Sequence, residues 1–443
     1  MKHRLMRPAL LPALLLGSLL LSGCTADTKD MPLPGERQSI LQLQTKLEPE
    51  NTTLDAQGFI APTAWSNEYW PQTGGYPNHA MQNLNLNEGA LTQIWSARIG
   101  KGTQKALPLT AQPIVVDGRI YTLDTNSRLT AFSIKDGKKL WDVNVRDKDE
   151  KDPVIGGGIA YSKGQLYVTS GYDEALSLSP ATGDIIWRVQ IPAPSRAAPT
   201  IMDDRLFIST LDNRLIALDT ATGTSLWEYA GLSEGAGLVG AASPAASREI
   251  VIPAFSSGEL SALRVENGTV AWSENLSALQ NLGGLSDIAD IRGLPVIDKG
   301  LVIAVSFGGK MVAIDERTGA RVWQRDVGSA NTPWVAGNHI FVMSTDDEIV
   351  AMGRDTGGIR WVRPLPQYGR PDKKKDPLFW TGPVLAGGRL IVAGSNGDVL
   401  ELSPNDGKLI RQFSVDKAIT IDPVVAGGVL YLLTEDGKLL AYK

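Results

Sequence analysis

The sequence predicts an all-β fold, an eight-bladed β-propeller with four antiparallel strands in each blade. Two observations lead to this prediction: a four-strand pattern recurs along the chain, and incomplete copies of it stand at both ends. In residues 111–141, the clearest copy, apolar runs are separated by Asp117-Gly118, by residues 125–127 and by Asp136-Gly137. Asp-Gly and Asn-rich turns favour the positive φ angles of hairpins. Such a small sheet cannot bury both faces alone, so we expect its copies to stack.

Six copies of the pattern end in a Gly-x-x-x-Trp motif. The tryptophans are Trp141, Trp187, Trp227, Trp272, Trp323 and Trp361, and a further copy has Arg411 at this position after Gly407. Most copies begin with a proline, which suits the first residue of a strand because it has no N–H to donate. The distance between these two markers is constant, whereas the spacers between copies vary, which is typical of structural repeats joined by variable loops.

The two ends of the chain contain complementary parts of one further copy. Residues 423–442 have three predicted strands and no fourth, whereas residues 91–99 form a lone predicted strand that contains Trp95. Pairing them completes an eighth sheet and removes an exposed edge that would invite aggregation. We therefore expect a closed propeller over residues 89–443, in which the N-terminal strand at about 91–99 closes the last blade. A series of separate β-sandwich domains would explain neither the repeats nor the chain ends.

The N-terminal residues resemble a bacterial lipoprotein signal. A basic start precedes an apolar stretch, residues 9–21, which is too short to span a bilayer comfortably. The sequence Leu-Ser-Gly before Cys24 resembles a lipobox, in which the cysteine is lipidated and becomes the first mature residue. We predict a signal peptide over residues 1–23 and lipidation at Cys24, with an ordinary secretory leader as the alternative. Cys24 is the only cysteine in the chain, so no intrachain disulfide can form.

Residues 24–88 are predicted to be a tether followed by a lead-in segment. Their first part is rich in Pro, Gln, Asn and Thr and lacks clear periodicity, which favours extended or disordered chain. Residues 65–83 are aromatic and Gly-rich, and we expect them to pack onto the propeller, with a partner-docking patch as the alternative. Thr25, which follows the lipidated cysteine, favours the outer membrane over the inner membrane in the lipoproteins that this signal resembles. The expected location is the periplasmic face of the outer membrane, through the lipid anchor.

The repeat motifs resemble those of quinoprotein-type propellers. Residues 217–227 and 313–323 both read Ala-[Leu/Ile]-Asp-x-x-Thr-Gly-x-x-x-Trp, which is similar to the tryptophan-docking motif of that superfamily. The resemblance implies that Trp95 and the six tryptophans named above pack between adjacent blades. Two branches share the motif: pyrroloquinoline-quinone dehydrogenases and the BamB family, lipoproteins of the machinery that assembles outer-membrane β-barrels. The lipobox, the length and the eight blades resemble the BamB family.

The sequence offers little support for catalysis. The resemblance to dehydrogenases would imply a bound calcium ion and commonly a disulfide of adjacent cysteines, but Cys24 has no neighbouring cysteine, and no haem signature is present. The three histidines are isolated, and no nucleophile triad, P-loop or dinucleotide fingerprint fits the scaffold. A net charge of −5 gives no support to nucleic-acid binding. We expect no enzymatic activity, cofactor or metal; a quinone-dependent dehydrogenase and a ligand-binding sensor propeller remain the alternatives.

The resemblance to the BamB family implies a partner-binding surface on the loops between blades. Leu285, Ser286 and Asp287 match a family motif that contacts a periplasmic POTRA domain of the barrel protein BamA, and Asp290 is displaced by one position from the motif's second aspartate. In the preceding loop, Leu238 is the nearest match to a Leu-x-Leu-Arg motif, whose arginine is absent here. An apolar anchor surrounded by charge is the usual anatomy of a binding hot spot. The alternative is that these acids only cap turns.

The expected function is therefore that of a scaffold subunit that docks onto a BamA-like protein and assists the insertion of outer-membrane proteins. Other lipoproteins of the assembly complex are further expected partners, and direct contact with unfolded outer-membrane proteins stays open. A basic loop at residues 363–375 is interpreted as solvated, with an acidic partner or anionic lipid headgroups as the alternative.

Overall fold

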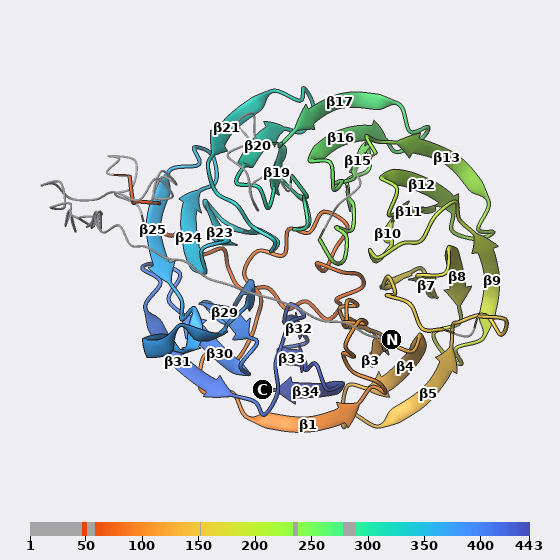
Figure 1. Ribbon diagram of the computed structural model, residues 1–443, viewed down its shortest axis with the longest axis horizontal. Coiled ribbons are helices and arrows are strands. Elements are labelled where there is room, and N and C mark those ends of the chain that lie inside the picture. The colour runs from red at the N-terminus through yellow and green to blue at the C-terminus, as the bar shows by residue number, and fades with distance from the viewer. Residues whose placement is uncertain (1–46, 51–57, 151, 234–237, 278–288) are drawn as a thin grey trace, which may run out of the picture. The chain divides into compact units, whose positions relative to one another are not determined.

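The computed structural model describes residues 47–50, 58–150, 152–233, 238–277 and 289–443. The chain from Leu47 to Lys443 forms one compact unit. Within the described residues, eight four-stranded antiparallel sheets are arranged as a ring (Figure 1), which confirms the predicted eight-bladed β-propeller. The expected signal peptide, 1–23, and Cys24 lie outside these residues. In the part of the chain that the structure describes, no helix is long and apolar enough to cross a membrane.

Blades 1 to 4 follow one another along the chain, and the first strand of each lies innermost. Blades 1 and 2 consist of β2 (Ile114–Val116), β3 (Arg119–Leu123), β4 (Arg128–Ser133) and β5 (Lys139–Asn144), then β6 (Ile159–Ser162), β7 (Gln165–Thr169), β8 (Glu174–Leu178) and β9 (Ile185–Gln190). Blades 3 and 4 consist of β10 (Thr200–Met202), β11 (Arg205–Ser209), β12 (Arg214–Asp219) and β13 (Ser225–Ala230), then β14 (Ala245–Ala246), β15 (Ile250–Ile252), β16 (Glu259–Arg264) and β17 (Val270–Asn275).

Blades 5 to 7 continue the ring, and blade 8 contains both ends of the propeller. Blades 5 and 6 consist of β18 (Val296–Asp298), β19 (Leu301–Val305), β20 (Met311–Asp315) and β21 (Arg321–Arg325), then β22 (Trp334–Ala336), β23 (His339–Met343), β24 (Glu348–Gly353) and β25 (Ile359–Pro364). Blades 7 and 8 consist of β28 (Trp380–Ala386), β29 (Arg389–Gly394), β30 (Asp398–Leu402) and β31 (Leu409–Ser414), then β32 (Val424–Ala426), β33 (Val429–Leu433), β34 (Lys438–Tyr442) and β1 (Gln93–Arg98).

The N-terminal strand β1 closes the ring, as predicted. It pairs antiparallel with β34, with Trp95 opposite Ala441 (Figure 1). Just before β1, Thr92 and Lys443 exchange two backbone hydrogen bonds of 2.9 Å. The outer edge of β34 is therefore paired, and the closing strand begins at Gln93, slightly later than the sequence pattern suggested.

The tryptophans of the repeat link each outer strand to the next blade. Trp227 of blade 3, for example, donates its indole N–H to the Val265 carbonyl of blade 4 at 3.0 Å. The same link to the following blade is made by Trp95, Trp141, Trp187, Trp272, Trp323 and Trp361. Gly268 has a φ of +71°, and a Cβ there would lie 2.5 Å from the Trp227 ring. Each glycine of the motif thus receives the tryptophan of the preceding blade.

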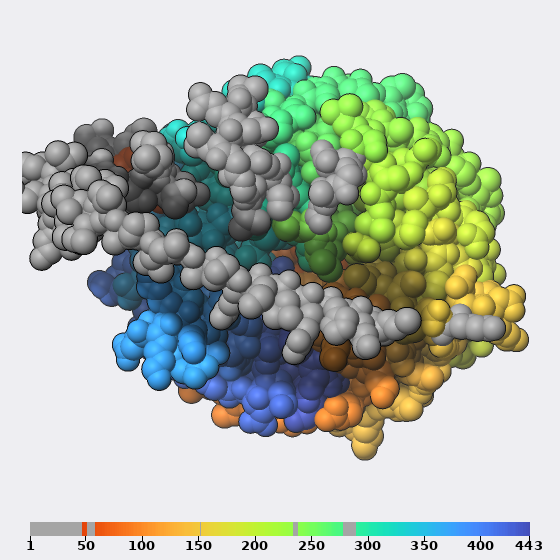
Figure 2. Space-filling view, in the orientation of Figure 1, coloured from red at the N-terminus to blue at the C-terminus, as the bar shows by residue number. Residues whose placement is uncertain are grey.

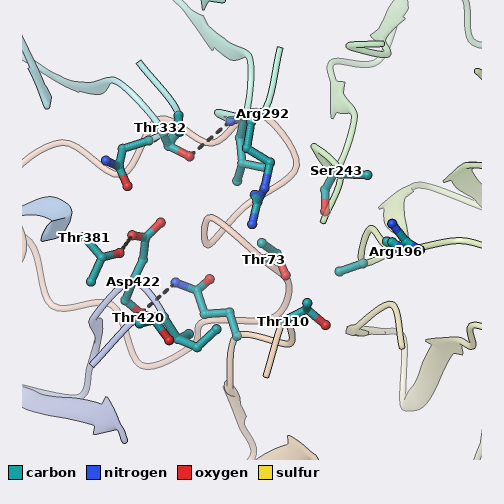
Figure 3. Close-up of a pocket in the computed structure, with 16 residues that line it drawn as sticks. Thr73, Thr110, Arg196, Ser243, Arg292, Thr332, Thr381, Thr420 and Asp422 are labelled. Carbon is teal, nitrogen blue, oxygen red and sulfur yellow. Dashed lines mark hydrogen bonds between the residues drawn. The ribbon is translucent and has the colours of Figure 1, made fainter. Parts of the chain in front are cut away.

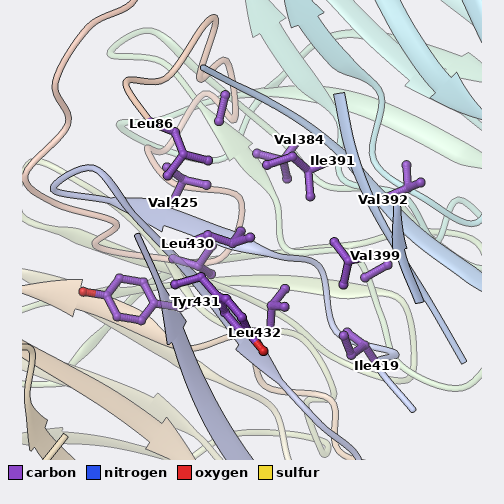
Figure 4. Close-up of a cluster of buried hydrophobic side chains, with 14 of the residues drawn as sticks. Leu86, Val384, Ile391, Val392, Val399, Ile419, Val425, Leu430, Tyr431 and Leu432 are labelled. Atoms are coloured by element: carbon purple, nitrogen blue, oxygen red, sulfur yellow. The ribbon is translucent and has the colours of Figure 1, made fainter. Parts of the chain in front are cut away.

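An ion cluster replaces the tryptophan at the junction of blades 7 and 8. Arg411 donates from Nε to Glu401 at 2.9 Å and from its terminal nitrogen to the Glu88 carbonyl. The Nε atom of Arg389 lies 2.6 Å from the same Glu401 oxygen, and both side chains are almost completely buried. Arg389 also donates to the Asn87 carbonyl, so the cluster holds the chain where it leads to β1. Apolar residues of both blades pack together in the cluster that Figure 4 shows.

The inner segment, residues 65–87, runs inside the ring (orange in Figure 1) and forms hydrogen bonds with every blade. Trp70 exchanges two backbone bonds with Val115 of blade 1, at 2.7 and 2.9 Å. Blades 2 to 8 are contacted by Pro71, Gln72, Pro77, Asn78, Gln82, Leu84 and Asn67, in that order. The aromatic, Gly-rich stretch therefore packs onto the propeller, as expected, and it does so along the innermost strands.

Candidate functional site

Two neighbouring loops between blades contain the predicted partner-binding residues. One connects β13 to β14, and the other connects β17 to β18. The structure brings Leu238 of the first loop to Asp290 of the second: the Leu238 N–H donates to the Asp290 carboxylate at 2.6 Å. Leu285, Ser286 and Asp287 lie outside the described residues, so their expected contact with a partner stays a prediction.

A second bond joins the same loops. The Arg292 Nε atom donates to the Val239 carbonyl at 2.9 Å, and a Cβ on Gly240 would lie 2.6 Å from an Arg292 terminal nitrogen. Gly240 also has a φ of +98°, a conformation that glycine adopts readily. A glycine at this position is therefore needed for the Arg292 guanidinium to lie flat against the first loop.

Asp290 is buried, which gives it a role within the chain. Only 5% of its surface is exposed, and this burial raises the pKa of the carboxyl, while the bond from the Leu238 N–H and the charge of Arg292 oppose the rise. A buried acceptor that fixes a loop positions neighbouring residues and offers little surface to a partner. The contact that the sequence suggested for Asp290 with a partner remains an expectation.

Among the described residues of these loops, the large side chains that are exposed are apolar. Val239 and Leu232 of the first loop are 55% and 61% exposed, and Leu211, in the turn between β11 and β12, is 37% exposed. Leu211 and Leu238 line one cavity of about 210 Å³ together with Asp290. Val239 lies between two residues that line this cavity, Leu238 and Gly240, whereas Leu232 lines a separate hollow. Isolated apolar residues are common on protein surfaces, but apolar side chains exposed near such hollows are typical of an interaction site. The sequence motif pointed to this loop but not to Val239, whose exposure depends on the tertiary structure.

A second, central cavity of about 100 Å³ adjoins the first one and shares Arg196 and Ala241 with it. Its walls come from residues that directly precede the innermost strands of several blades, and its floor includes Thr73 of the inner segment. Figure 3 shows Arg292 pointing into this cavity from one side and Asp422 lying on another side, beside Thr381. Sequence reasoning missed both residues, since Arg292 lies just outside the motif of its loop and Asp422 has no motif around it.

The basic loop at 363–375 forms a small separate hairpin between blades 6 and 7. It comprises β26 (Tyr368–Arg370), a 3₁₀ turn (Pro371–Lys373) and β27 (Lys375–Pro377). Its residues are mostly exposed, and Arg370 pairs with Asp376 across it. Figure 2 shows this light-blue hairpin standing out at the edge of the ring. Both interpretations of the loop, solvated or facing an acidic partner, remain predictions.

The described residues contain no group of three or more His, Cys, Asp or Glu side chains that could hold a metal ion. His79, on the inner segment, is 3% exposed, and its Nδ1–H donates to the Pro295 carbonyl at 2.7 Å. Burial lowers the pKa of His79 to about 4, which the bond to Pro295 only partly opposes. A neutral, enclosed imidazole of this kind serves packing and has no access to a substrate.

Comparison with known proteins identifies the family. A family model described as outer membrane protein assembly factor BamB matches residues 84–154, 147–363 and 371–443, which together cover most of the chain. The chain belongs to the BamB family. An outer membrane protein assembly factor BamB of Salmonella typhimurium is 27% identical over 362 residues, which cover 80% of this chain and 89% of that protein. The resemblance noted in the repeats is thereby confirmed, and most of the inner segment precedes the part that matches the BamB model.

Solved structures agree with the BamB assignment at the level of the fold. BamB from Moraxella catarrhalis aligns with a TM-score of 0.69 at 22% identity, covering 80% of this chain and 100% of that chain. A quinohemoprotein alcohol dehydrogenase from Comamonas testosteroni aligns with a TM-score of 0.66 at 12% identity, covering 86% of this chain and 81% of that chain. At these identities the likeness concerns the propeller alone, so the dehydrogenase gives no argument for catalysis here.

Proposed function

We propose that this chain is a non-enzymatic scaffold subunit of the machinery that assembles outer-membrane β-barrel proteins, held at the periplasmic face of the outer membrane by lipid on Cys24. It docks onto the periplasmic POTRA region of a BamA-like barrel protein. Membership of the BamB family supports the general role. The observation that favours docking is the pair of joined loops, in which Val239 is exposed between two residues that line a cavity, Leu238 and Gly240.

The design of these loops suits a docking surface. Asp290 and Arg292 are used inside the chain, each bonding the backbone of the opposite loop. They fix the loop that contains Val239 before a partner arrives, and such preorganisation reduces the entropy lost on binding. The exposed side chains of Val239 and Leu232 then supply apolar area, which is the usual energetic centre of an interface.

The experiment is a Val239→Asp variant tested for co-purification with the BamA-like protein. Because the Val239 side chain is exposed and only its carbonyl is bonded, the change leaves the loop contacts in place. A buried carboxylate at the centre of an interface is costly, so we expect recovery of the partner to fall at least about tenfold. The matched control is Val322→Asp, a similarly exposed valine on the outer strand β21.

The two variants separate docking from folding. The proposal requires that Val239→Asp loses the partner while Val322→Asp retains it and both keep the β-sheet circular dichroism of the original protein. Equal recovery with both variants and the original protein would show that this loop is not the docking surface.

A further inference from the structure

We propose that the central cavity binds a small zwitterion, an α-amino acid of the size of glycine or alanine, between Arg292 and Asp422. The ligand's carboxylate faces the guanidinium, and its ammonium faces the aspartate. Arg292 also holds the docking loop, but through its Nε atom alone, so the ligand would meet atoms that the loop contacts leave free.

The Arg292 guanidinium has unused donors in the cavity. Its Nε atom bonds the Val239 carbonyl, but its two terminal nitrogens have no hydrogen-bond or ion-pair partner among the described residues. Figure 3 shows the terminal nitrogens directed into the cavity. Burial lowers the pKa of the guanidinium, and the charges of Asp422 and then Asp290 oppose this. A half-buried cation with free donors is suited to bind a carboxylate.

Asp422 supplies the opposite charge. One of its carboxylate oxygens accepts hydrogen bonds from the Thr381 hydroxyl and from the Gly382 N–H, the latter at 2.9 Å. The other oxygen has no partner within the described part of the chain and belongs to the cavity wall. No ion pair within 4.0 Å joins Asp422 to Arg292, although each feels the other's charge. The two charges therefore face a shared space without neutralising each other directly.

The remaining walls are polar and firmly held. Ser243 is 2% exposed, yet its hydroxyl has no hydrogen-bond partner among the described residues and lines the cavity. Gln112 accepts from the Trp70 indole at 3.0 Å and from the Gly74 N–H at 2.9 Å, and it donates to the Asp422 carbonyl at 3.2 Å. These bonds anchor the wall beside Asp422 to the inner segment, so the cavity is formed before a ligand enters.

Size and charge together select the ligand class. The cavity holds about 100 Å³, well below the roughly 300–1,000 Å³ of pockets for drug-sized ligands, so only a few non-hydrogen atoms fit. The charged side chains that line the cavity are Arg196, Arg292 and Asp422. A simple anion is attracted by the two arginines but repelled by Asp422, whereas a simple cation is attracted by Asp422 but repelled by the arginines. A molecule that has both charges a few atoms apart satisfies both groups, and an amino acid is the smallest common one.

The test is calorimetric titration of the purified protein with glycine, compared with acetate and methylammonium at matched ionic strength. Each of the last two has one of glycine's charges. We expect glycine to bind with a Kd near or below about 1 mM and each comparison compound to bind at least about tenfold more weakly. Binding of acetate as tight as that of glycine, or no binding of glycine, would overturn the proposal.

Two cavity variants locate the site. Arg292→Gln retains a donor for the Val239 carbonyl, and Asp422→Asn retains an acceptor for Thr381 and Gly382, so both are designed to fold. Each is expected to weaken glycine binding at least about tenfold, because one charge of the pair is lost. Arg248→Gln, at an exposed turn of blade 4, is the control and should bind as the original protein does. Unchanged binding in both cavity variants would place any observed binding elsewhere and refute the assignment.

Discussion

Replacing Glu401 with glutamine should open the junction between blades 7 and 8. Glu401 is 1% exposed and is the only carboxylate that contacts Arg389 and Arg411 within the described residues. Glutamine keeps the volume and one oxygen but removes the negative charge. Arg389, itself 2% exposed, would then remain as a buried cation without a counter-charge.

The size of the effect follows from the burial of the two arginines. Burial already lowers the pKa of Arg389, and the charge of Glu401 is the main influence that opposes it. Removing one partner of a buried ion pair typically costs about 3–5 kcal/mol. The Arg411 side chain is about a third exposed, so water can take over part of its solvation. We therefore expect the free energy of unfolding to fall by about 3 kcal/mol.

Urea unfolding followed by tryptophan fluorescence measures this change, since Trp361 and Trp380 lie in the same apolar cluster as blade 7. The control is Asp376→Asn, which breaks the exposed pair with Arg370 and should leave the unfolding midpoint almost unchanged. If Glu401→Gln shifted the midpoint no more than this control, the cluster would not be what stabilises the junction.

Two further perturbations test the packing of the ring. Gly319→Ala should lower the free energy of unfolding in urea by about 1–3 kcal/mol more than Gly118→Ala does. Both glycines have similar positive φ angles, but only a Cβ on Gly319 would lie against Trp272, at 2.5 Å. Equal losses in the two variants would contradict the packing of Trp272 on this glycine. His79 has a folded-state pKa of about 4, below its ordinary 6.5. Its neutral form therefore contributes to the free energy of unfolding above pH 6.5, and this contribution is lost as the pH falls towards 4. Between pH 6.5 and pH 4, the free energy of unfolding of the original protein should fall by about 3 kcal/mol more than that of a His79→Gln variant. If the free energies of unfolding of the two proteins changed in parallel with pH, the burial of a neutral imidazole would be refuted.

The repeated features of the ring could be predicted from the sequence because each is local and recurs. Gly-x-x-x-Trp marks a turn and an outer strand in six copies, so an error of interpretation in one copy is corrected by the others. The pairing of β1 with β34 (Figure 1) followed from counting strands at the two ends, and the structure confirms it. The sequence did not show that the glycine and the tryptophan of one motif lie at different junctions between blades. Gly268 contacts Trp227 of the preceding blade, whereas Trp272 packs on the following blade.

The non-repeated features could not be predicted in the same way. The inner segment bonds each blade through one or two groups, mostly backbone atoms, and such contacts leave no periodic pattern in side chains. The family motif assigned Asp290 to a partner surface, but its carboxylate turns inward to a backbone N–H of another loop. Arg292 and Asp422 are distant in sequence and share a cavity only because the ring brings their loops together.

The course of the inner segment has a consequence for the order in which the protein folds. Residues 70–84 form hydrogen bonds with blades 1 to 7 in the same order in which those blades are synthesised. Each new sheet can therefore pack onto a segment that has already been made. The closing strand β1, in contrast, must wait for β34 at the other end of the chain. Contacts across so long a separation form slowly because the loop entropy must be lost first. Until β34 has been synthesised, the ring therefore stays open, with the finished blades packed along the inner segment.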